Sequence, residues 1–163
     1  MPLIIAALLA AALGLPDLFA NAAQARTAAE RFAPKGVLIE LKATEEAGVV
    51  ELTWTYFDGD SYPDKDFFVD VVVREGAPSV RLNREPKRTL KPAALDLSMA
   101  AVPWSKLQPP ADDPFSKWEG FRLRPREGGV PCWRTKLKSG APIYFDARTG
   151  KQSDACGQPW KNR

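Results

Sequence analysis

Two cysteines constrain this chain more than any other feature, because they bracket a segment with the pattern of a β-hairpin. Cys132 stands just before the β-prone run 133–137, and a second such run, 142–145, follows a loop that contains Gly140. Glycine supplies the permissive backbone that a chain reversal needs. A bond to Cys156 would close a loop of about 25 residues, and no other cysteine competes for either partner. We therefore predict a Cys132–Cys156 disulfide, with two buried thiols as the alternative.

The same hairpin carries a family resemblance. Its strand residues 133–137, Gly140 and the run 143–151, which ends in Asp-Ala-Arg-Thr-Gly-Lys, resemble the closing hairpin of PepSY-type domains. Those domains are periplasmic or extracellular modules linked to protease inhibition or to signalling proteins. The resemblance implies a regulatory or protease-inhibitory domain with a helix ahead of its closing strands, and it covers residues 133–151 only. Prolines occupy much of the place where that helix would lie, so we keep this interpretation as an alternative.

The N-terminus has the pattern of an export signal. The apolar run 2–15 matches the hydrophobic region of a signal peptide and is shorter than the roughly 20 residues that span a bilayer. The segments 20–22 (Ala-Asn-Ala) and 23–25 (Ala-Gln-Ala) suit a signal peptidase. No Lys or Arg precedes the apolar run, which leaves retention as the alternative to cleavage. We predict that residues 1–25 are a signal peptide or an N-terminal membrane anchor and that residues 26–163 form a single β-rich extracytoplasmic domain, periplasmic or extracellular.

Alternation of apolar and polar side chains predicts a mainly antiparallel β fold. The clearest case is 49–57, where Val50, Leu52, Trp54 and Tyr56 alternate with polar residues. Further strands are expected at 37–41, with Val37, Ile39 and Leu41 on one face, and at 67–74, 79–83, 118–124, 133–137 and 142–145. A short helix is expected at 22–32. The proline-rich segment 84–114 is expected to lay its apolar side chains on the sheet, namely Leu95, Leu97, Val102 and Trp104. The sequence thus predicts a small β-sandwich or β-roll of about six or seven short strands.

Composition excludes several kinds of catalysis. The chain contains no histidine, which rules out Ser-His-Asp and Cys-His catalysis and most zinc arrangements. If its two cysteines are paired, no thiol nucleophile is left. No glycine-rich phosphate loop is recognisable, and we predict no cofactor. We lean towards a non-enzymatic protein; a carboxylate-dependent hydrolase is the alternative, although no spacing marks a pair of acids.

Aspartates cluster in the turn expected between the second and third strands. They are Asp58, Asp60, Asp64 and Asp66. An acidic loop can supply oxygen ligands to calcium, but the EF-hand pattern fails because Tyr62 stands at its fifth position and no Glu closes the loop. A solvated turn rich in Asp and Gly explains the same residues, so calcium is a minor alternative.

Positive charge gathers in the second half of the chain. Residues 26–79 hold six basic and eleven acidic side chains, whereas residues 80–163 hold seventeen basic and eight acidic ones. With strand alternation, several of these cations would line one face. The candidate residues for binding an anion or a partner are Arg122, Arg124, Arg134, Lys136, Lys138 and Trp160. A solvated surface of mixed charge is the alternative.

These observations together predict an exported, non-enzymatic binding or accessory protein. One form would be the extracytoplasmic subunit of a membrane-associated complex. The expected partner is a protein or a membrane complex, with an anionic membrane surface as a second candidate. Nucleic acid is not expected as the partner of an exported chain.

Overall fold

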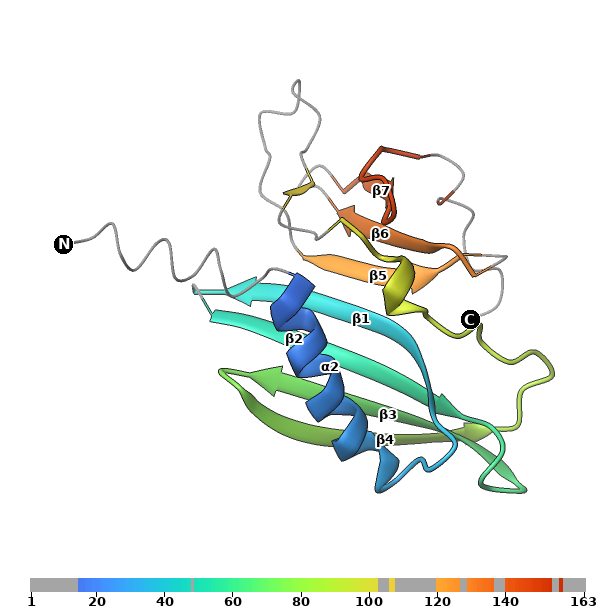
Figure 1. Cartoon of the computed structure of the whole chain (residues 1–163). Coiled ribbons are helices and arrows are strands. Elements are labelled where there is room, and N and C mark those ends of the chain that lie inside the picture. Colours follow the sequence, from blue (N-terminus) through green and yellow to red (C-terminus); the bar gives the residue numbers. More distant parts are fainter. Residues whose placement is uncertain are drawn as a thin grey trace.

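The computed structural model describes residues 15–47, 49–102, 106–107, 120–126, 129–136, 140–153 and 156. Seven antiparallel strands form one sheet in the order β4-β3-β2-β1-β5-β6-β7 (Figure 1). The strands are β1 (Val37–Glu46), β2 (Val49–Asp58), β3 (Lys65–Arg74), β4 (Ala77–Pro86), β5 (Phe121–Pro125), β6 (Pro131–Lys136) and β7 (Pro142–Asp146). Within the described residues, the other named elements are one α-helix, α2 (Leu15–Glu30), and one 3₁₀ turn, η1 (Leu97–Met99). The predicted antiparallel, mainly β fold class is confirmed, and the strands belong to one sheet.

An unbroken row of apolar side chains crosses the whole sheet at one register. From β4 to β7 it consists of Val80, Val71, Trp54, Leu41, Leu123, Trp133 and Phe145. All except Val80 are buried, and Trp54 and Trp133 are fully buried. Because side chains alternate along a strand, this row and its neighbours give the sheet one apolar face. Buried aromatic side chains contribute much of the apolar area on which such a thin fold depends.

Two segments cover that apolar face. Helix α2 lies across β2, β3 and β4 (Figure 1), and its Ala25 and Ala29 are buried in the core. Alanine lets a helix approach the sheet closely. The helix continues across residue 25, the predicted boundary between the signal peptide or anchor and the β-rich domain. Within the described part of the chain, no helix has the length and apolar character needed to cross a membrane.

The segment between β4 and β5 covers the other half. Leu95 is buried, and its backbone N–H donates to the Leu38 carbonyl at 2.7 Å. The indole Nε1–H of Trp133 donates to the Val102 carbonyl at 2.7 Å, and the Val102 N–H donates to the Ala147 carbonyl at 2.9 Å. The prediction that this segment packs on the sheet is confirmed for Leu95, Leu97 and Val102; Trp104 lies outside the described residues.

The predicted disulfide joins Cys132 of β6 to Cys156, and both cysteines are buried. It fixes a C-terminal segment that runs along the outer edge of β7. Gln152 forms a bridge with Phe145, and the Ser153 N–H donates to the Tyr144 carbonyl at 3.0 Å. An edge strand leaves backbone groups unpaired, so this segment satisfies part of the β7 edge.

Gly120, the residue before β5, sets how closely β5 approaches β1. Its φ is +146°, and a Cβ built on it would lie 2.9 Å from the Ala43 carbonyl oxygen. Real Cβ atoms do not come that close to backbone, so the two strands would have to separate.

We expect Gly120→Ala to lower the free energy of unfolding by about 1–2 kcal/mol, from backbone strain plus the clash with β1. Urea denaturation would measure the change. Gly76→Ala is the matched control, because Gly76 also has a positive φ of 76° but nothing lies near its Cβ position. A loss no larger in Gly120→Ala than in Gly76→Ala would contradict the close approach.

Candidate functional site

Three cations lie side by side on the face of the sheet opposite α2, which we call the polar face although the buried residues Phe57 and Val72 also lie on it. Lys42 of β1 is the register partner of Arg122 of β5, and Arg122 is the register partner of Arg134 of β6. We refer to Lys42, Arg122 and Arg134 as the cationic row. Directly opposite residues on neighbouring strands have Cβ atoms about 4.5–5.5 Å apart, and like charges so placed repel each other. The fold therefore concentrates positive charge across three adjacent strands.

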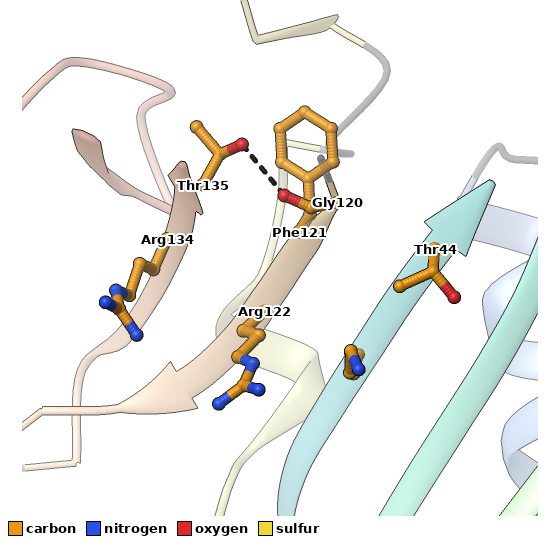
Figure 2. A pocket seen from close by; sticks show the side chains of 7 residues that line it. Thr44, Gly120, Phe121, Arg122, Arg134 and Thr135 are labelled. Carbon is orange, nitrogen blue, oxygen red and sulfur yellow. Dashed lines mark hydrogen bonds between the residues drawn. The ribbon is translucent and has the colours of Figure 1, made fainter. Parts of the chain in front are cut away.

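A hollow of about 260 Å³ lies beside the cationic row. Its lining residues are Lys42, Thr44, Gly120, Phe121, Arg122, Arg134 and Thr135. Figure 2 shows Arg122 and Arg134 extending from neighbouring strands to the same side, with Thr44 across from them on β1. The Thr135 hydroxyl donates to the Gly120 carbonyl at 2.8 Å, which ties β6 to the residue that opens β5.

The hollow follows from the short pairing between β1 and β5. Among the described residues, β1 and β5 are in register only at Leu41–Ala43 and Phe121–Leu123, whereas β1 pairs with β2 along nearly its whole length. Past Ala43, β1 continues to Glu46, but β5 has not yet begun. Thr44 and Gly120 therefore lie at the point where the two strands part.

The charge around the row is unevenly compensated. Glu40 and Arg124, each two residues along its strand from Lys42 or Arg122, form an ion pair with side chains 12% and 16% exposed. Arg134 holds its guanidinium 6.0 Å from the centre of the Tyr144 ring, a cation–π distance. Among the residues that the structure describes, neither Lys42 nor Arg134 has a carboxylate within ion-pair distance. Among the described residues, the charges of Lys42 and Arg134 are therefore not paired with a carboxylate, whereas Arg124, two residues from Arg122, is paired with Glu40.

The predicted binding residues are partly brought together. Arg122 and Arg134 meet as cross-strand partners, while Arg124 is engaged with Glu40. Lys136 pairs with Pro142 through the β6–β7 ladder, and its side chain is not among those described. Lys138 and Trp160 lie outside the described residues. The anion-binding role of all six stays a prediction.

Sequence reasoning missed Lys42, Thr44 and Gly120. Strand alternation does place Lys42 and Thr44 on the polar face, opposite Leu41 and Ala43. Nothing local, however, indicates that this face of β1 adjoins β5.

The acidic turn has structural partners of its own. Asp58 is fully buried and accepts hydrogen bonds from the N–H groups of Lys35, Asp60 and Ser61 and from the Ser61 hydroxyl, at 2.6–3.1 Å. Burial by itself would raise the pKa of Asp58, but these hydrogen bonds outweigh it and hold the pKa below its usual range.

Asp60 and Asp66 connect the turn to the segment after β4. Asp66 accepts from the Arg88 N–H at 2.8 Å, and Asp60 forms an ion pair with Lys91. Asp64 is exposed. Among the described residues no three metal-ligating side chains gather. Calcium binding by this turn stays an untested alternative.

The chain resembles one solved structure in fold. A protein from Clostridium difficile 630, described as a "putative lipoprotein", superimposes with a TM-score of 0.51 at 9% identity, over 78% of this chain and 86% of that chain. At this identity the likeness concerns the fold alone. No known protein family matches the sequence, and no curated protein matches it. The PepSY resemblance gains no support from these comparisons.

Proposed function

We propose that this chain is an exported, non-enzymatic binding or accessory protein that contacts an anionic partner through its polar face. The observation that carries this proposal is the cationic row, in which Lys42, Arg122 and Arg134 stand in register beside the hollow. Complementary charge steers association and fixes the orientation of partners. Positive side chains aligned across three strands repel one another and so do not stabilise the fold, but they are suited to binding an anionic partner.

The disulfide supports export. Disulfides form and persist in oxidising compartments and are rare where thiols are kept reduced. The fold neighbour described as a "putative lipoprotein" is compatible with this location. A subunit on the outer side of a membrane-associated complex is the form of accessory protein that we favour.

The lining of the hollow favours binding over hydrolysis. Its described lining residues provide three cations and two threonine hydroxyls but no carboxylate. Glycoside-type hydrolysis needs two carboxyl groups facing one another across the substrate. Asp58 is the most buried acid of the turn, and its carboxylate oxygens already accept four hydrogen bonds.

Site-directed photo-crosslinking in the native host tests the proposal. A photoreactive residue at Thr53, which neighbours Lys42 across the β1–β2 ladder, should capture a distinct partner. The same residue at the exposed position Ala94 serves as the placement control. We expect Lys42→Gln with Arg134→Gln to lower the adduct yield about tenfold or more, because each charge-assisted hydrogen bond is worth about 1.5–3 kcal/mol.

The matched control removes two cations elsewhere. Arg31 and Lys151 are exposed and have no ion pair among the described residues. The variant Arg31→Gln with Lys151→Gln changes net charge equally and should leave the yield unchanged. Equal yields from all variants, or equal adducts from residues 53 and 94, would reject the polar face as the contact surface.

A further inference from the structure

We infer that the hollow beside the cationic row binds a phosphate monoester group. This inference rests on the proposed function and names the chemical group that the polar face recognises. It comes from three features of the site: its size, its donors and the distribution of charge around it.

The size of the hollow suits a compact group. About 260 Å³ is close to the lower end of ligand pockets, which run from about 300 to 1,000 Å³. A phosphate with a few attached atoms fits such a volume, whereas a folded segment or a large cofactor does not.

The donors match a tetrahedral dianion better than a carboxylate. Each guanidinium presents a planar fork of N–H groups that can bind two oxygens at once, and Lys42 adds a mobile ammonium. Thr44 adds a hydroxyl at the rim of the hollow. A phosphate monoester offers three terminal oxygens and a charge of about −1.5 to −2 at neutral pH, whereas a carboxylate offers two oxygens and a single charge.

The sheet holds these donors in place before any ligand arrives. Lys42, Arg122 and Arg134 lie on hydrogen-bonded neighbouring strands, so their relative backbone positions are fixed. The Tyr144 ring lies beside the guanidinium of Arg134. Glu40 is engaged by Arg124, and among the described residues no carboxylate lies within ion-pair distance of Lys42 or Arg134. An anion in the hollow would offset the charges of Lys42 and Arg134, and this favours binding.

Two sources can present this group: a soluble phosphate monoester and the headgroup of a phospholipid such as phosphatidic acid. The test therefore titrates the purified full chain with inorganic phosphate, with glycerol 3-phosphate, and with vesicles containing phosphatidic acid. Phosphatidylcholine vesicles and succinate are the controls. Amide chemical shifts at Thr44, Gly120 and Arg134 report on the soluble ligands, and co-sedimentation reports on the vesicles.

We expect phosphate ligands to shift the three amides, or phosphatidic acid vesicles to retain the protein, in preference to their controls. Lys42→Gln with Arg134→Gln should weaken this binding about tenfold or more, while Arg31→Gln with Lys151→Gln should leave it unchanged. Binding of soluble monoesters identifies a free ligand, and binding of vesicles alone identifies a headgroup; both support the inference.

Other outcomes overturn it. Succinate binding as tightly as phosphate would replace phosphate with carboxylate recognition. Binding that survives loss of Lys42 and Arg134 would place the phosphate site elsewhere. No binding of any phosphate ligand would also reject the inference. The photo-crosslinking experiment would then decide the proposed function by itself. If residue 53 still captures a partner, and that capture still depends on Lys42 and Arg134, the proposed function stands although the phosphate inference fails.

Discussion

Reduction of the Cys132–Cys156 disulfide should lower the free energy of unfolding by about 3 kcal/mol. The bond joins residues 24 positions apart, and closing a loop of this length removes that much conformational entropy from the unfolded chain. Urea denaturation of the oxidised and the reduced protein, each followed by tryptophan fluorescence, would measure the difference. Because the reduced unfolded chain is less compact and exposes more surface, we expect the midpoint to fall and the slope of the transition to rise.

The loss should also have a local component. The segment after β7 is attached through the Gln152 bridge and the Ser153 N–H, both close in sequence to Cys156. Hydrogen exchange at the Ser153 amide should therefore accelerate on reduction more than exchange at Trp54, in the centre of the sheet. The variant Cys132→Ala with Cys156→Ala should behave like the reduced protein. A reduced protein with an unchanged midpoint would show that the bond does not stabilise the fold.

Asp58→Ala should lower the free energy of unfolding by about 2–3 kcal/mol. The substitution removes the carboxylate that accepts from the N–H groups of Lys35, Asp60 and Ser61. Because Asp58 is fully buried, these donors lose their acceptor where water does not readily replace it. It also releases the β2–β3 turn from the chain that enters β1. Thermal or urea denaturation at pH 7 would measure the loss. Asp64→Ala is the matched control in the same turn, and because Asp64 is exposed we expect a change within about 0.5 kcal/mol.

The Asp58 contribution should depend on pH in a defined direction. The folded-state pKa of Asp58 is lowered, so the native state favours the ionised carboxylate. Its stabilising effect is then present above the unfolded pKa of about 3.9 and is lost as the pH falls through the folded pKa. The difference in unfolding free energy between the wild type and Asp58→Asn should shrink as the pH is lowered from about 6 to 3. A difference that stays constant across this range would contradict the lowered pKa.

Loss of cations from the polar face should affect binding and not stability. Lys42→Gln and Arg134→Gln remove cations from the polar face, where the described residues give them no ion pair to break. They should therefore leave stability unchanged or raise it slightly, because they relieve repulsion within the cationic row. A binding defect without a stability defect would separate recognition from folding.

Local patterns in the sequence predicted most of the strands and part of the core. Alternation in 49–57 predicted which side chains of β2 face inward, because the side-chain period of a strand is two whatever its neighbours are. The cysteines predicted their own pairing because the chain has only two. Leu95 and Val102 were recognisable as residues that pack on the sheet, because a proline-rich segment with that much apolar content can bury it only there.

A bulge shows where local patterning fails. Val37, Ile39 and Leu41 were expected to share one face, yet Val37 is 40% exposed while Leu38 packs against the core. The register of β1 against β2 shifts between Leu38 and Glu40. One extra residue in a ladder inverts the faces beyond it, and the alternation of the sequence does not show where pairing will slip.

The sequence by itself determined that this chain is a disulfide-closed antiparallel β protein with a basic second half. Only the tertiary structure decided that Lys42 stands beside Arg122, 80 residues away, and that a hollow opens where β1 and β5 part. The physical reason is that side-chain periodicity is a property of each strand alone. The order of strands in a sheet is a property of the whole chain, set by which apolar faces can be buried together.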